Sequence, residues 1–191
     1  MISRFAGSKN PIAAEHIIKI SLLLPPGKDV LTSLEPLVLV AEDSMKNQDV
    51  PRGYLESWRS MVLGLLEYRR WHDKAAWDLS QRSLDFPART ASRDAAATLM
   101  QAMAAWRLKR ATEARGKLQQ ARQTIEDRFK HPLVFNEADK GAWFDWLDAR
   151  ILLREATELI EGKPGGISTL RGEPAPAGVI SPRRLSAARG R

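Results

Sequence analysis

Two segments of the chain repeat each other at a spacing of 38 residues. GLLEYRRWHDKAAW begins at Gly64, and AMAAWRLKRATEAR begins at Ala102. The recurring positions are two small residues and an aromatic–arginine pair: Gly64 with Ala102, Tyr68 with Trp106, Arg69 with Arg107 and Ala76 with Ala114. A period of this size is typical of stacked helical hairpins, which cannot bury their apolar faces alone. The repeat therefore predicts an all-α fold, in a class of protein that usually binds other proteins.

The small residues fall where two helices of one hairpin should cross. Gly64 and Ala102 lie in the middle of the predicted first helices, while Ala76 and Ala114 lie early in the second helices and should face them. A bulky side chain at a crossing would push the helix axes beyond their usual separation of about 8–10 Å. We expect both hairpins to be closely packed at these positions.

Apolar periodicity and helix-end signals predict seven helices and no strand. Pro36 falls in the first turn of the second helix, where its missing N–H is tolerated. LVLV, beginning at Leu37, could form a strand by itself, but the apolar stretch continues to Met45 without a turn signal and favours a helix. The predicted helices cover 11–24, 32–45, 54–70, 72–84, 92–109, 112–129 and 142–160.

Composition divides the chain into three parts. We expect residues 1–9 to be a flexible N-terminus and residues 10–162 to form a solenoid of about three hairpins plus a capping helix, with a linker at 47–53. Residues 163–191 are rich in Gly, Pro and Arg without an aromatic residue, and should be a disordered tail. The tail carries +5 of the formal net charge of +7, so the nearly neutral body does not resemble a DNA-binding surface.

The sequence also limits location and cofactors. It has no cysteine, which excludes disulfides and thiolate metal sites. The apolar stretch near the N-terminus is interrupted by Glu15, His16 and Lys19, unlike a secretory signal, and no run reaches the roughly 18 apolar residues of a membrane span. We expect a cytoplasmic protein that contacts no membrane and needs no cofactor.

The small–aromatic–small spacing resembles the tetratricopeptide repeat, although Trp71 and Lys109 stand where that repeat has a turn glycine. From Ala13 to Glu161 the chain also resembles the C-terminal helical-repeat region of large serine/threonine protein kinases and WD40-repeat proteins of planctomycete-type bacteria. Asp145-Trp146 and the stretch LLREA from Leu152 match the final motif of that region. The resemblance implies a tetratricopeptide-like right-handed solenoid that serves as an accessory module. The phosphate-binding loop and the catalytic and metal-binding motifs of a kinase are absent from the sequence.

In the resembling repeat family, one face of each first helix lines a groove for a partner. Carried over to this chain, that face holds Trp58, Met61, Leu65, Tyr68, Arg69, Ala96, Leu99, Met103, Trp106 and Arg107. The repeated aromatic–arginine pair could hold a peptide through an acidic side chain or a C-terminal carboxylate. The alternative is that Tyr68 and Trp106 pack between repeats while the arginines pair with local acids such as Glu67.

The remaining candidate residues favour structural roles. We expect Trp71, Trp77, Trp143 and Trp146 to pack in the core or the cap. The three histidines, His16, His72 and His131, show no spacing to carboxylates that would suit a metal or a general base. Asp145, Asp148 and Glu155 are expected on the solvated face of the last helix, and no nucleophile–base pair is evident.

These observations predict a non-catalytic protein–protein interaction or scaffolding module, an accessory region of a bacterial signalling protein of the kinase or WD40 type. It should bind a protein or peptide and no small-molecule substrate. The second hypothesis is a nucleic-acid-associated protein whose basic tail, with SPRR at Ser181, binds without sequence preference. A degenerate fragment without an independent role is the third.

Overall fold

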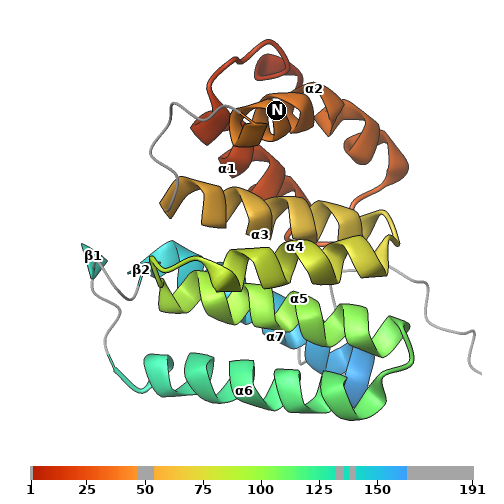
Figure 1. The fold of residues 1–191 in the computed structure, drawn as a ribbon, viewed down its shortest axis with the longest axis vertical. Helices are drawn as coiled ribbons and strands as arrows, with labels where there is room; N and C mark the ends of the chain where they lie inside the picture. Colours follow the sequence, from red (N-terminus) through yellow and green to blue (C-terminus); the bar gives the residue numbers. More distant parts are fainter. Residues whose placement is uncertain (1, 47–53, 132–135, 138–140, 163–191) are drawn as a thin grey trace, which may run out of the picture.

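The computed structural model describes residues 2–46, 54–131, 136–137 and 141–162, and these ranges form seven α-helices (Figure 1). The linker at 47–53 and the basic tail at 163–191 lie outside the described residues. A 3-10 turn, η1, precedes the helices, and two very short strands precede the last one. The elements are η1 (Ile2–Arg4), α1 (Pro11–Leu22), α2 (Lys28–Lys46), α3 (Tyr54–Arg69), α4 (Asp73–Asp85), α5 (Ala91–Arg107), α6 (Ala111–Phe129), β1 (Asn136–Glu137), β2 (Gly141–Ala142) and α7 (Trp143–Glu161).

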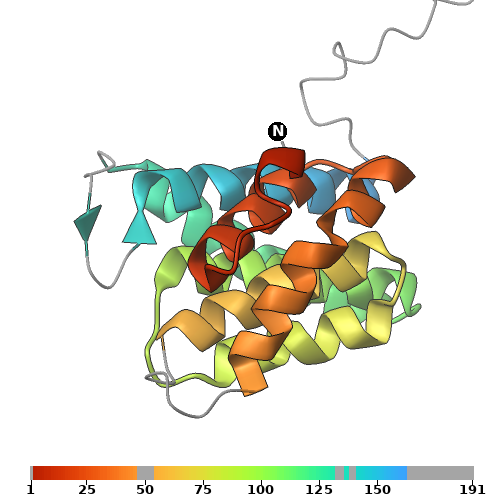
Figure 2. The same cartoon turned by 90° about the horizontal axis from the view of Figure 1, so that it is seen from above.

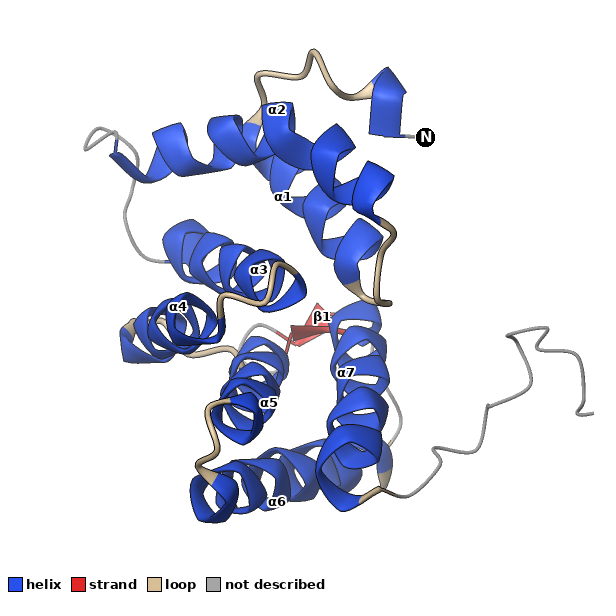
Figure 3. Cartoon of the chain, turned by 90° about the vertical axis from the view of Figure 1, so that its right-hand side faces the viewer, coloured by secondary structure: helices blue, strands red, loops and turns tan. Residues whose placement is uncertain are grey.

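The helices pack in a recurring pattern. Three sequential hairpins form, α1 with α2, α3 with α4 and α5 with α6. Helix α3 contacts both α1 and α2. In the same way α5 contacts both α3 and α4, and α7 contacts both α5 and α6 (Figures 1 and 3). Each hairpin thus covers an apolar face that its neighbour leaves open. One apolar core runs through all seven helices as a result.

The crossing of α3 with α4 is as close as the small residues predict. A Cβ atom added at Gly64 would lie 3.1 Å from Ser80 Oγ and 3.4 Å from the carbonyl oxygen of Ala76. In the next hairpin the equivalent residues, Ala102 and Ala114, are both fully buried. The repeated small residues therefore occupy the interior of their hairpins.

The two hairpin turns are also equivalent. Trp71 has φ 67° and Lys109 has φ 63°, so both non-glycine residues are in the left-handed region. In the first turn the backbone N–H of His72 donates to the carbonyl of Glu67, and in the second the N–H of Arg110 donates to that of Ala105. This bond satisfies a carbonyl at the helix end and is the bond that a turn glycine usually accompanies.

The helix bounds agree with the sequence predictions to within a few residues at most ends. Helix α1 begins as expected, because Asn10 Oδ1 accepts hydrogen bonds from the backbone N–H groups of Ile12 and Ala13. Helix α2 differs, since it begins at Lys28 instead of Thr32. Pro36 therefore lies inside this helix and not in its first turn.

One further expectation needs correction. The sequence predicts no strand, but β1 and β2 form a two-residue antiparallel pair that projects from one side of the helical body (Figure 2). In the N-terminal segment, η1 contacts α2, and Ile2 packs against the core. No helix in the described part of the chain has the length and apolar character to cross a bilayer.

Candidate interaction site

Most of the predicted groove residues lie inside the molecule. On α3 the exposed fraction is 6% for Trp58 and 7% for Arg69. Trp106 and Arg107, at the end of α5, are half-buried. The remaining candidates are also buried and lie on α3 or α5: Met61, Leu65, Tyr68, Ala96, Leu99 and Met103.

The last helix covers the face on which these residues lie. Trp58, Met61 and Leu65 share a small space with Asp145 and residues further along α7. The volume in which the centre of a water molecule fits is only about 10 Å³, so the space holds one water at most. The sequence interpretation of an open groove on this face is therefore wrong for this structure, because α7 and the end of α1 fill it.

Arg69 holds α7 in this position. Its Nε donates to the carbonyl of Leu22 at 2.9 Å, and its Nη2 donates to that of Leu23 at 3.1 Å. Its Nη1 and Nη2 also bind the two carboxylate oxygens of Glu155 at 2.5 and 2.7 Å. A bidentate arginine–carboxylate pair is among the strong hydrogen-bonded contacts in proteins. Arg69 thus joins the end of α1 to the middle of α7.

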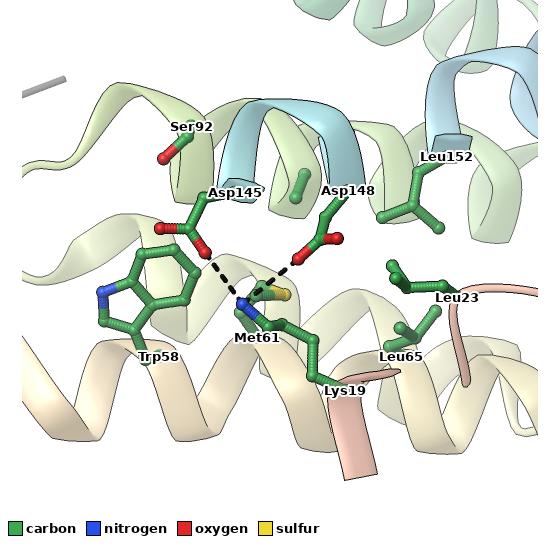
Figure 4. A pocket seen from close by; sticks show the side chains of 10 residues that line it. Lys19, Leu23, Trp58, Met61, Leu65, Ser92, Asp145, Asp148 and Leu152 are labelled. Carbon is green, nitrogen blue, oxygen red and sulfur yellow. Dashed lines mark hydrogen bonds and ion pairs between the residues drawn. The ribbon is translucent and has the colours of Figure 1, made fainter. Parts of the chain in front are cut away.

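A second charged contact joins α1 to α7. Lys19 Nζ lies 2.8 Å from Asp145 Oδ1 and 3.2 Å from Asp148 Oδ2, so the ammonium group stands between the two carboxylates (Figure 4). It also lies 5.1 Å from the ring centroid of Trp58 and 5.5 Å from that of Phe144. The side chains of Lys19 and Asp145 are 6% and 8% exposed. This contact is a buried ion pair and not a surface one.

These contacts overturn the prediction that Asp145, Asp148 and Glu155 form a solvated helix face. Asp145 is buried, Asp148 is half-buried against Lys19, and Glu155 pairs with Arg69. The sequence did contain one signal. A lysine in the otherwise apolar stretch IIKISLLL marks a position where a buried charge needs a partner.

The buried charges also shift one another's pKa values. Burial would lower the pKa of Lys19, but Asp145 and Asp148 outweigh burial and raise it. Burial raises the pKa of Asp148 despite Lys19, and it raises the pKa of Glu15 to about 7. The pKa of His16 is lowered by burial and by Lys19. Glu15 therefore titrates close to neutral pH in the folded protein.

The tryptophans divide into buried and exposed groups. Trp146 is 1% exposed and lies in the core. Trp71 is 72% exposed and Trp143 is 40% exposed, which differs from the expected core or cap packing. Trp77 is half-buried on α4, with Arg110 Cζ 4.9 Å from its ring centroid.

Trp71 is the exposed member of a cluster at the hairpin-turn end of α3 and α5. The guanidinium carbon of Arg107 lies 3.8 Å from the ring centroid of Tyr68 and 3.9 Å from that of Trp71. Arg107 Nη1 donates to the carbonyl of Tyr68 at 2.9 Å and contacts Asp73 Oδ1 at 3.3 Å. We call Tyr68, Trp71, Asp73 and Arg107 the turn-edge cluster. From the predicted aromatic–arginine pairs it contains Tyr68, which is buried, and Arg107, which is half-buried.

No group of three or more His, Asp or Glu side chains suited to a metal ion occurs among residues 2–46, 54–131, 136–137 and 141–162. Glu67, the predicted partner of the repeated arginines, instead contacts Arg70 and His72. No family model, curated protein or solved structure matches this chain.

Proposed function

We propose that this chain is a non-catalytic tetratricopeptide-like module, a right-handed solenoid that binds another protein. The observation that carries the proposal is the equivalence of the two central hairpins. They share the small residues at the crossing, the left-handed turn residue and the way each packs on the preceding hairpin. Proteins built this way present extended surfaces to other macromolecules.

The partner should contact the turn edge and not the covered face of α3 and α5. Trp71 is the most exposed large apolar side chain of the described residues, and Arg107 lies stacked beside it. Tryptophan and arginine are enriched among the residues that contribute most to protein–protein binding. The turn-edge cluster is therefore where we expect the partner to bind.

Photo-crosslinking tests this proposal. A benzoylphenylalanine at Trp71 should yield a discrete crosslinked protein in the native cells, identifiable by mass spectrometry. The same group at Leu39, which is 59% exposed on α2, is the matched control. Identical crosslinks at both positions, or none at Trp71, would contradict binding at the turn edge.

The resemblance to kinase and WD40 accessory regions leads to a second part of the proposal. We expect the partner or parent protein to contain a serine/threonine kinase or a WD40 region. The check is whether such a region is encoded next to this one. If crosslinked partners and neighbouring genes contain neither region, this assignment fails while protein binding itself can stand.

Nucleic-acid binding remains the alternative function because residues 163–191 carry six basic side chains and one acidic one. Binding through this tail would weaken steeply with salt, with a logarithmic slope of at most roughly −4 on single strands for six phosphate contacts. Filter binding of a labelled oligonucleotide to the full chain and to a chain ending at Gly162 distinguishes the two functions. Loss of tight, salt-sensitive binding in the shorter chain would favour the alternative.

A further inference from the structure

The two repeated arginines use their donors differently. Both donate to a carbonyl at the end of the preceding inner helix, Arg69 to Leu22 and Arg107 to Tyr68. Arg69 in addition holds both oxygens of the Glu155 carboxylate. Arg107 has no such carboxylate, since Nε and Nη2 make no hydrogen bond within the described part of the chain.

The nearest acid to Arg107 does not replace that carboxylate. Asp73 contacts only Nη1, through one oxygen at 3.3 Å, and this nitrogen already donates to the carbonyl of Tyr68. The edge formed by Nε and Nη2 points away from that pair of contacts, because the two nitrogens lie on the other side of the planar guanidinium. One of the two equivalent arginines thus keeps an edge suited to a bidentate carboxylate.

The aromatic neighbours hold the Arg107 guanidinium in place. The rings of Tyr68 and Trp71 each lie within 4 Å of its central carbon, one fully buried and the other 72% exposed. An arginine stacked in this way loses little further freedom when it binds. Trp71 has φ 67° and Lys109 has φ 63°, so this backbone conformation belongs to the hairpin turn. The exposure of the Trp71 ring beside Arg107 is what leaves it open to a partner.

We infer that Arg107 and Trp71 form a binding site for one carboxylate of an acidic side chain on a protein partner. This inference rests on the proposed function and specifies how the partner is recognised. The chain itself contains an example of such a ligand. Helix α7 carries Glu155, which binds Arg69, three residues after the buried Leu152. A partner segment with the pattern Leu-X-X-Glu would place its glutamate on Arg107 and its leucine against Trp71.

The Nε and Nη2 edge of Arg107 matches the two oxygens of one carboxylate. The other acids at this end of the helices are already in use. Asp73 contacts Arg107 Nη1, and the carboxylate of Glu155 pairs with Arg69.

Matched peptides test the inference. An array of 12-residue peptides carrying Leu-X-X-Glu, each paired with its Leu-X-X-Gln version, is probed with the full chain, and the peptides that bind are titrated by fluorescence anisotropy. The Glu peptides should bind about tenfold more tightly than the Gln peptides, as one charged hydrogen-bonded contact implies. Arg107→Gln and Arg107→Lys should remove this difference, and Trp71→Ala should weaken both peptides.

Arg115→Gln is the matched control. Arg115 also lies over an indole ring, that of Trp106 at 5.6 Å, and pairs with no acid of the described residues. Equal losses from Arg107→Gln and Arg115→Gln would show general charge attraction and overturn the inference, as would equal binding of the two peptide versions. If Arg107→Gln unfolds, the wild-type chain is titrated with each peptide and the NMR resonance of the Arg107 Nε–H is followed. The Glu peptide should shift this resonance and the Gln peptide should not, and equal shifts would overturn the inference. A crosslinked partner that still binds Arg107→Gln would sink this site and leave the proposed function standing.

Discussion

Individual side chains at the ends of the inner helices connect one hairpin to the next. Arg69 donates to the final carbonyls of α1, and Arg107 donates to the carbonyl of Tyr68 near the end of α3. A cation at a helix C-terminus satisfies carbonyls without an intrahelical partner and interacts well with the helix dipole. The recurring arginine therefore has a structural role at both positions. Within the part of the chain that the structure describes, Arg107 Nε and Nη2 make no hydrogen bond, whereas Arg69 uses all three nitrogens.

Replacing Lys109 by glycine should stabilise the protein. Lys109 is exposed and left-handed, a conformation that strains any residue with a Cβ atom. Relief of this strain, less the greater chain entropy of glycine, should raise the free energy of unfolding by about 0.5–1 kcal/mol. Urea unfolding measures the change, and Lys109→Ala is the control because alanine keeps the Cβ. A Lys109→Gly variant no more stable than Lys109→Ala would contradict the prediction.

Glu15 should make stability depend on pH near neutrality. Its pKa is about 7 in the folded protein against 4.5 for the free side chain, because burial outweighs attraction by Lys19 and Arg59 and Asp145 adds repulsion. Between these two values the folded state binds more protons than the unfolded state, so stability falls as pH rises from about 4.5 through 7. The loss should be on the order of 3 kcal/mol in all.

Glu15→Gln removes this titration. We expect urea midpoints of the variant to exceed those of the wild type at pH 8 and to approach them at pH 5. Glu42→Gln, at an exposed position on α2, is the matched control. Parallel pH profiles for Glu15→Gln and the wild type would rule out a buried Glu15 that titrates near pH 7.

At the scale of elements, hairpin packing follows from how closely two helices can approach. Gly64 and Ser80 meet where α3 crosses α4, while Ala102 and Ala114 occupy the equivalent interior positions of the next hairpin. Short side chains let the neighbouring leucines of both helices interdigitate, which is the main source of burial in these pairs. The hairpins are therefore sensitive to volume at these positions.

Gly64→Val should destabilise the chain. The added branched side chain would meet Ser80 and the backbone of Ala76 within 3.4 Å, and overpacking of this kind costs about 1–3 kcal/mol. Gly116→Val is the control, since no atom lies within 4 Å of a Cβ at Gly116 on α6. Thermal unfolding followed by circular dichroism should show a lower midpoint for the first variant only. Equal shifts of the two midpoints would indicate that the helix propensity of valine, and not its volume at the α3–α4 crossing, sets the change in stability.

At the scale of the whole molecule, α7 closes the array. It packs on α5 and α6 and is held to α3 and α1 by Glu155 with Arg69 and by Asp145 with Lys19 (Figure 3). Both pairs join residues far apart in the chain, and both are largely withdrawn from water. Breaking such a pair leaves a buried charge without its partner, so the two contacts specify where α7 sits.

Removing α7 should disrupt the fold, whereas removing the tail should not. A chain ending at His131 exposes the apolar faces of α3 and α5 and leaves Arg69 and Lys19 without their carboxylates. We expect it to bind the dye ANS and to lose cooperative unfolding. A chain ending at Gly162 lacks only a segment without aromatic residues and should unfold at the wild-type urea midpoint. Cooperative unfolding of the chain that ends at His131 would show that α7 is dispensable.

The sequence by itself determined the helices and the small residues shared by two hairpins. These features depend on local interactions: apolar periodicity, the Asn10 cap, and small residues repeated at Gly64 and Ala102. The sequence did not determine the turns, because Trp71 and Lys109 stand where a glycine is usual and yet adopt the left-handed conformation. Only the tertiary structure decided which apolar face is covered by which helix. The sequence shows that α3 and α5 carry apolar faces, but an open groove and a groove filled by α7 have the same periodicity.

The charged residues illustrate the same limit. Asp145 and Glu155 look like solvated positions of an amphipathic helix, yet their partners lie 126 and 86 residues away. No local pattern encodes such pairs, because they form when desolvation in the closed array makes an unpaired charge too costly. Packing likewise left Arg107 half-buried against Trp71 while it buried the equivalent Arg69. The sequence therefore placed equivalent residues in two hairpins, and the packing of α7 determined that Arg69 pairs with Glu155 while Arg107 does not.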